Sequence, residues 1–204
     1  MIVIEDKAQQ DGKHRLKHDY WDKSEICWQR FPLPVGDYII ANKQVLDVIE
    51  RKQKRDIEVK KMDFLGTYKQ SVDTKKDMQE IVGNICGQQH GRFRDECILA
   101  QNNNIKLYVL IENTDGIKEL EDVFKWQNPR IHRYNKIAYM HRLGKWENIP
   151  LPKAAPTNGP TLAKAMLTMQ AKYGVEFHFC RPEEAGKRIL ELLEVDEDVR
   201  SDVD

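Results

Sequence analysis

Short apolar runs alternate along this chain with segments whose apolar residues recur every three or four positions. Apolar residues predict strands at 2–4, 24–28 and 107–111. The run at 107–111 is continuously apolar, which is typical of a central strand covered on both faces. Residues 175–179 alternate between apolar and other side chains, which indicates one more strand near the end of the chain.

Helical spacing marks the segments between these strands. Met78, Ile81, Val82 and Ile85 recur at helical intervals after Asp77. Further helices are predicted over residues 92–101 and 117–124, over 161–173 with Thr161 as its N-cap, and from Pro182 onward. Strands interleaved with helices predict an α/β fold, in which a mixed central sheet is flanked by helices.

Two acidic residues and a lysine suggest a catalytic hairpin in the first half of the chain. A turn centred on residues 42–43 would pair residues 38–41 with a strand from 44 through 52. Alternate side chains of a strand share a face, so Glu50 and Lys52 would point the same way as Asp37 on the neighbouring strand. Glu50 would then be a diagonal neighbour of Asp37, with Cβ atoms about 7 Å apart.

Two carboxylates at that separation can bind one divalent cation. Mg²⁺ and Mn²⁺ favour oxygen ligands and keep several water molecules, so Asp37 and Glu50 with a substrate phosphate would suit either ion. Lys52 beside the metal could orient a water molecule or offset charge on the phosphate. On spacing alone, a solvated charged hairpin explains the same residues equally well, because Glu58-Val59-Lys60 repeats the short acid-x-Lys pattern.

Four sequence blocks follow one another along the chain. They are Val35-Gly36-Asp37-Tyr38-Ile39, Val48-Ile49-Glu50-Arg51-Lys52, Gly91-Arg92-Phe93-Arg94 with Glu96, and Leu107-Tyr108-Val109-Leu110-Ile111-Glu112. Together they resemble the nuclease domain of the XPF family of structure-specific endonucleases. That family carries Gly-Asp-Tyr, then Glu-Arg-Lys-x-x-x-Asp, then a Gly-Arg-aromatic helix start, then an apolar strand that ends in Glu.

The resemblance implies a restriction-endonuclease-like fold and a metal-dependent enzyme that cuts branched, flap or junction-containing DNA. It implies that Asp37 and Glu50 are ligands of Mg²⁺ or Mn²⁺ and that Lys52 is the catalytic lysine. Arg51 and Arg92 would support the site near the phosphate backbone. DNA is the implied partner, and the resemblance leaves a homodimer open.

The chain departs from the family pattern in several places. The first strand offers Glu5 or Asp6 where the family carries Asp-x-Arg-Glu, and Asp56 and Asp77 compete for the role of the later aspartate. The stretch before Gly91 is long, which suggests an insertion near residues 53–76. No paired helix-hairpin-helix module follows, so the chain resembles a minimal or viral-type version.

Charge is balanced over the whole chain but not locally. The 204 residues contain 33 Lys and Arg against 33 Asp and Glu, so the total charge gives no general signal for nucleic acid. Residues 125–145 carry six Lys or Arg, no acid, and interleaved aromatic residues, which predicts a surface that contacts phosphates. A solvated helix with inward-facing tyrosines fits this segment as well.

Length and composition favour one domain. We expect a single nuclease domain over residues 1–195, with insertions near 53–76 and 126–160, followed by an acidic, disordered tail at 196–204. The four cysteines lack a Cys-x-x-Cys pair, which favours reduced and mostly buried thiols. With no signal peptide or apolar span, a cytoplasmic or nucleoid-associated protein is expected, in the host cytoplasm if the source is viral.

The sequence therefore predicts an endodeoxyribonuclease, a phosphodiester hydrolase that uses a divalent metal. A non-catalytic DNA-binding or scaffold subunit of the same fold is the alternative from a different class. An exonuclease or a resolvase of four-way junctions would keep the fold and change the substrate.

Overall fold

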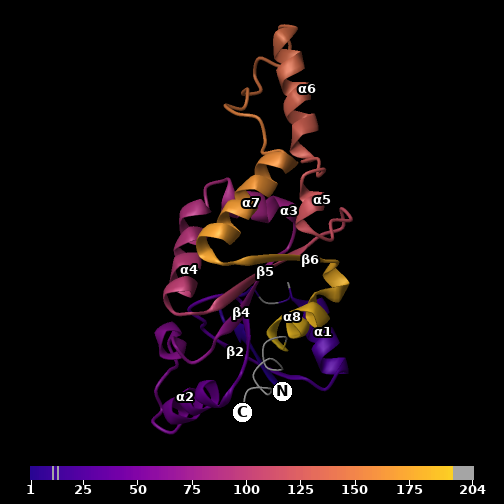
Figure 1. The fold of residues 1–204 in the computed structure, drawn as a ribbon. Coiled ribbons are helices and arrows are strands. Elements are labelled where there is room, and N and C mark those ends of the chain that lie inside the picture. Colours follow the sequence, from indigo (N-terminus) through magenta and orange to yellow (C-terminus); the bar gives the residue numbers. More distant parts are fainter. Residues whose placement is uncertain (11, 13, 195–204) are drawn as a thin grey trace.

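A mixed β-sheet forms the centre of the molecule (Figure 1). The computed structural model describes residues 1–10, 12 and 14–194. Within this part of the chain, six strands pair in the order β2-β1-β3-β4-β5-β6. They are β1 (Ile2–Asp6), β2 (Cys27–Phe31), β3 (Tyr38–Ile40), β4 (Gln70–Lys75), β5 (Lys106–Glu112) and β6 (Glu176–Cys180).

The directions of the strands place Asp37 beside the C-terminal ends of two other strands. β1 pairs in parallel with β2, and β4, β5 and β6 are parallel to one another. The short β3 runs antiparallel to both β1 and β4. The start of β3 therefore lies beside the ends of β1 and β4, and Asp37 immediately precedes it.

Helices cover both faces of the sheet. Alternation along β5 sends Val109 and Ile111 to one face and Leu110 to the other. The Leu110 face packs against α1 (Arg15–Lys23) and α8 (Ala185–Glu194), the latter preceded by the 3₁₀ turn η2 (Pro182–Glu184).

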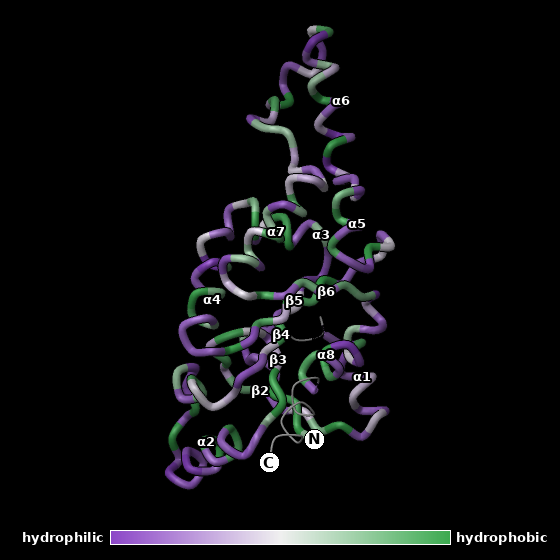
Figure 2. The backbone as a smooth tube through the Cα atoms, in the orientation of Figure 1, coloured by the Kyte–Doolittle hydropathy of each residue, from purple (hydrophilic) through white to green (hydrophobic). Residues whose placement is uncertain are grey.

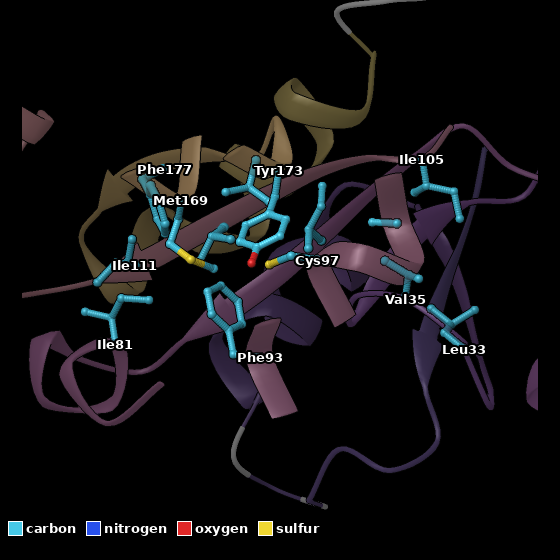
Figure 3. Close-up of a cluster of buried hydrophobic side chains, with 14 of the residues drawn as sticks. Leu33, Val35, Ile81, Phe93, Cys97, Ile105, Ile111, Met169, Tyr173 and Phe177 are labelled. Atoms are coloured by element: carbon cyan, nitrogen blue, oxygen red, sulfur yellow. The ribbon is translucent and has the colours of Figure 1, made fainter. Parts of the chain in front are cut away.

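The opposite face carries the larger apolar core. It packs against α2 (Lys43–Gln53), the 3₁₀ turn η1 (Lys61–Phe64), α3 (Met78–Ile85), α4 (His90–Asn102) and α7 (Gly159–Tyr173). Figure 3 shows part of this core, where Phe93 and Cys97 from α4 meet Met169 and Tyr173 from α7. The predicted α/β class, with a mixed sheet flanked by helices, is confirmed.

Most predicted elements lie close to their expected positions, and the capping residues show where two of the helices begin. Asp77 caps α3 as expected, whereas α7 is capped by Asn158, whose side chain accepts from Thr161 N, and not by Thr161 itself. Gly174 ends α7 with a φ of 70°, a left-handed conformation that favours glycine.

The predicted hairpin is wrong. Asn42 accepts a hydrogen bond from Val45 N at 3.0 Å and so begins α2, not a turn between strands. Val45, Val48 and Ile49 are the buried residues of this helix, and their spacing of three and four positions fits one helical face. The next strand along the chain that pairs with β3 is β4. It lies inside the segment predicted as an insertion at 53–76.

A helical arm leaves the compact part of the molecule between β5 and α7 (Figure 1). After the short α5 (Leu120–Val123), α6 (Arg130–Arg142) projects outward, and residues 143–158 return to α7. Figure 2 shows that the arm is mixed in hydropathy, without the continuous apolar stretches of the sheet. The predicted tail at 196–204 lies outside the described residues.

Two of the four predicted thiols are buried. Cys97 and Cys180 are buried and Cys27 and Cys86 are exposed, and all four are free. The expectation of mostly buried cysteines therefore holds for only half of them. Within the described residues, none of the helices combines the length and the apolar character needed to cross a membrane.

Candidate active site

Asp37 is held against β4 by hydrogen bonds to both backbone and side chain. Its amide donates to Val72 O at 2.8 Å, which continues the antiparallel pairing of β3 with β4. Its Oδ2 accepts from Thr74 N and from Thr74 Oγ1, each at 2.8 Å. The carboxylate is therefore fixed beside the C-terminal end of β4.

β4 carries an acid-x-Lys pair next to this carboxylate. Asp73 and Lys75 are two positions apart on a strand, so they share a face. Lys75 Nζ lies 2.8 Å from Asp73 Oδ1 and 2.7 Å from Oδ2, and both side chains are almost fully buried. Oδ2 accepts no hydrogen bond from the described residues despite this contact. Lys75 is thus the main partner of this buried carboxylate, whose oxygens have further lone pairs that can bind a ligand.

Glu96 joins the site from α4. Gly36 N donates to Glu96 Oε1 at 2.9 Å, which ties the helix to the turn before Asp37. Gly36 has a φ of 71°, and a Cβ added there would lie 1.9 Å from Ser71 Oγ. Glycine is therefore required at this close approach of the turn to β4.

The three acids open into a polar cleft of about 430 Å³. Asp6 also lines it from the end of β1, with its Oδ1 accepting a hydrogen bond from Leu33 N at 3.0 Å. Arg92 lies on the same helix as Glu96 and borders the cleft. The charged residues that line it are Asp6, Asp37, Lys61, Asp73, Lys75, Glu80, Arg92 and Glu96. Carboxylates outnumber the basic groups, so the cleft attracts cations.

Burial and mutual repulsion perturb the ionisable groups. Burial raises the pKa of Asp73 well above its usual value, and the charges of Asp37 and Glu96 add to this effect while Lys75 opposes it. Burial also raises the pKa of Glu96. Burial alone would lower the pKa of Lys75, but Asp73, Asp37 and Glu96 more than offset it, so the pKa lies above the ordinary value. Strongly perturbed groups in a cleft mark a candidate functional site.

The donor set fits a hard divalent cation that binds together with its substrate. Among the described residues, no three His, Cys, Asp or Glu side chains are placed to enclose a metal ion. Mg²⁺ is usually bound by one or two carboxylates, water and substrate phosphate rather than by a complete protein cage. Asp37 and Asp73, whose carboxylates both line the cleft, could supply the two carboxylates of such a site.

The structure divides the residues predicted from the sequence into two groups. Asp37 and Arg92 line the cleft. Glu50, Arg51 and Lys52 lie on α2, where Glu50 pairs with Lys54 and Lys52 Nζ lies 2.9 Å from Asp63 Oδ2. Because residues 43–53 form a helix, the predicted juxtaposition of Glu50 and Lys52 with Asp37 does not occur.

The acid-x-Lys pair of the cleft was missed although its pattern was visible. Asp73-Thr74-Lys75 ends a segment whose Val72 and Thr74 are β-branched, as expected of a strand. Of the two candidates in the first strand, Asp6 faces the cleft, whereas Glu5 faces the other side of the sheet and contacts His18. Asp77 caps α3, and Asp56 lies in the turn after α2 with a φ of 53°.

Comparisons with known proteins define the class and then the family. The sheet and its helices have the restriction-endonuclease-like fold, as in the solved structure of XPF from Aeropyrum pernix in complex with DNA. That match has a TM-score of 0.51 at 14% identity and covers 99% of this chain and 68% of the other. The chain belongs to the ERCC4 domain family, whose sequence profile matches residues 6–193. No curated protein matches it significantly in sequence.

Proposed function

We propose that the chain is a divalent-metal-dependent DNA endonuclease that hydrolyses phosphodiester bonds in branched, flap or junction-containing DNA. The observation that carries this proposal is the meeting of Asp37, Asp73 and Lys75 in one polar cleft. Membership of the ERCC4 domain family and the fold shared with an XPF protein solved with DNA support it.

Each residue of the cleft has a distinct part in this proposal. Asp37 and Asp73 would hold Mg²⁺ or Mn²⁺, which when bound supplies positive charge that stabilises the transition state of phosphodiester hydrolysis. Lys75 lies against Asp73, and the surrounding carboxylates raise its pKa, so it would act in the cleft as a hydrogen-bond donor. Its ammonium can then orient the attacking water or a phosphate oxygen.

Residues at the margin of the cleft would position the DNA. Arg92 lies on α4 at the cleft and can pair with a phosphate, a contact that fixes the DNA backbone but reads no sequence. Glu96 would act through the hydrogen bond from Gly36 N, since it holds the turn that presents Asp37. A cytoplasmic or nucleoid-associated location fits an enzyme acting on DNA.

A cleavage assay with several DNA structures tests the proposal. Labelled flap, fork, four-way-junction and linear DNA are incubated with the full chain in Mg²⁺, Mn²⁺ or EDTA. We expect endonucleolytic cutting of the branched substrates with either metal and none in EDTA. Asp37→Asn should abolish cutting, and Asp47→Asn on the exposed face of α2 should not. Binding without cutting under every condition would instead identify a non-catalytic DNA-binding or scaffold subunit.

A further inference from the structure

The arm formed by α6 and its return segment has little contact with the rest of the chain. All residues of α6 are described, and of these Ile137 alone is buried. The helix extends away from the sheet (Figure 1), over about 20 Å for its thirteen residues. A projecting element of this length can reach a part of a substrate that lies outside the catalytic cleft.

The arm carries an excess of positive charge. Residues 130–158 contain one acid, Glu147, against six Lys or Arg, namely Arg130, Arg133, Lys136, Arg142, Lys145 and Lys153. This local excess stands out in a chain whose formal net charge is zero. Such a surface suits a polyanion, but it would also suit an acidic protein surface, so a second signal is needed to choose between them.

Exposed aromatic rings supply that second signal. Tyr139 is 54% exposed and Trp146 is 39% exposed, and Leu143 lies one helical turn beyond Tyr139. A cation accompanies each ring, because Arg142 Cζ lies 5.9 Å from the ring centre of Tyr139 and Lys136 Nζ lies 5.5 Å from that of Trp146. Rings next to cations are the arrangement that binds bases and phosphates of an unpaired strand.

The turn that presents Trp146 is held in an unusual conformation. Trp146 has a φ of 58°, which is rare for a bulky residue and costs free energy. His141 Nε2 bonds to Ile149 O and closes the loop around it. The chain therefore keeps an apolar ring exposed at the end of α6 although the local backbone is strained there.

The root of the arm is fixed next to a helix of the catalytic cleft. Asn128 is buried and accepts a hydrogen bond from Gln79 Nε2 on α3 at 2.9 Å, while its Nδ2 donates to Thr157 O at 2.8 Å. Glu80, the residue after Gln79, lines the cleft. The two ends of the arm are thus joined to each other and to α3, which sets the direction of the arm relative to the site.

We propose that the outer part of this arm, around Tyr139 and Trp146, binds an unpaired DNA strand. The rings stack on bases, and Lys136, Arg142 and neighbouring cations contact the phosphates between them. Duplex DNA hides its base faces, so rings alone favour the unpaired strand of a branched substrate. The inference rests on the proposed function for its substrate, and it adds the element that recognises the unpaired part.

Binding measurements in EDTA test the arm separately from catalysis. Fluorescence anisotropy of a labelled oligothymidine and of a blunt duplex is followed with the full chain. The double variant Tyr139→Ala/Trp146→Ala should bind the oligothymidine at least about fivefold more weakly, since each stacked base is worth about 1 kcal/mol or more. Duplex affinity should change less than about twofold, since only the rings are lost and the phosphate-binding cations remain.

Matched variants separate stacking from general damage. Tyr139→Phe/Trp146→Phe keeps two flat rings and should retain oligothymidine binding. Leu46→Ala/Leu167→Ala removes exposed apolar side chains elsewhere and should have no effect. Binding of wild type should also quench tryptophan fluorescence, and Trp146→Phe should remove that quenching.

Two outcomes would overturn the inference. One is oligothymidine binding by a folded alanine double variant that equals binding by wild type. The other is a change in the oligomeric state of that variant, measured by light scattering, with unchanged affinity for the oligothymidine. That result would identify the arm as a contact between two copies of the chain. If the wild-type chain cuts none of the DNA substrates but still binds the oligothymidine through the arm, the proposed function is contradicted and this inference stands.

Discussion

Gly36 N donates a hydrogen bond to Glu96 Oε1 across 2.9 Å, although the two residues are 60 positions apart in the chain. This bond joins the turn before Asp37 to the helix that carries Arg92. Side chains of the cleft come from several elements, among them β1, the turn before β3, η1, β4, α3 and α4. Their relative positions depend on close packing at Gly36.

Substitution of Gly36 should disrupt both stability and the site. A Cβ at Gly36 would meet Ser71 Oγ at 1.9 Å, and that buried hydroxyl already bonds to Val35 O and Tyr38 O. We expect Gly36→Ala to lower the free energy of unfolding by more than about 2 kcal/mol in urea denaturation.

Gly66 offers a matched control for this effect. It has a φ of 82°, but a Cβ there would meet no atom within 4 Å. Gly66→Ala should therefore cost only the backbone strain, about 1 kcal/mol. If Gly36→Ala and Gly66→Ala lowered the free energy of unfolding equally, the contact with Ser71 would be unimportant.

The stability of the fold should depend on a buried ion pair on the face of the sheet that packs against α1 and α8. Lys17 on α1 pairs with Glu112 at the end of β5, and both side chains are largely buried. Lys17→Met leaves the carboxylate without its partner and should cost about 3 kcal/mol of unfolding free energy.

The double variant provides the check on this interpretation. Lys17→Met/Glu112→Met removes both charges, so it should be more stable in urea denaturation than Lys17→Met alone. A double variant less stable than the single would mean that packing, and not the unpaired charge, accounts for the loss.

His14 should make stability depend on pH. Burial first, and then Lys17, lowers the pKa of His14 from 6.5 to about 4, while Asp37 opposes the change and His18 and Arg30 reinforce it. Between these two values the unfolded chain binds a proton at His14 that the folded chain does not, so stability falls as pH falls from 6.5 to 4.

His14→Gln should flatten this dependence. One such group contributes at most about 1.4 kcal/mol per pH unit, and the contribution is smaller here because solvent screens a half-buried ring. Urea denaturation of the two proteins is compared at several pH values between about 4 and 6.5, the range over which the folded and unfolded chains differ in protonation at His14. Parallel profiles would rule out His14 as the source.

Local patterns were sufficient for most of the fold. Continuous apolar residues defined β5, and helical spacing after Asp77 defined α3. The same reasoning applied to Val45, Val48 and Ile49 indicates the helix α2, but the strand was predicted from an assumed turn at 42–43 and the acid-x-Lys pattern of Glu50 and Lys52. Helical spacing after an Asn N-cap was the stronger signal.

The site was only partly predictable because it is assembled by long-range contacts. The geometric expectation, an acid-x-Lys on a strand beside Asp37, describes Asp73 and Lys75 and not Glu50 and Lys52. Spacing cannot choose between such pairs until the strand that neighbours β3 is known. The bond between Gly36 and Glu96 and the direction of the α6 arm likewise depend on tertiary packing.

Parallel cleavage assays on the two acid-x-Lys pairs test the central claim most directly. Asp73→Asn and Lys75→Ala are compared with Glu50→Gln and Lys52→Ala on labelled fork DNA in Mg²⁺. We expect at least about a 100-fold loss of cleavage rate for each β4 variant, as for loss of a group that stabilises a transition state. Each α2 variant should stay within about twofold of wild type, as expected for substitutions away from the site. Full activity of Asp73→Asn, together with loss of activity in Glu50→Gln, would contradict the account.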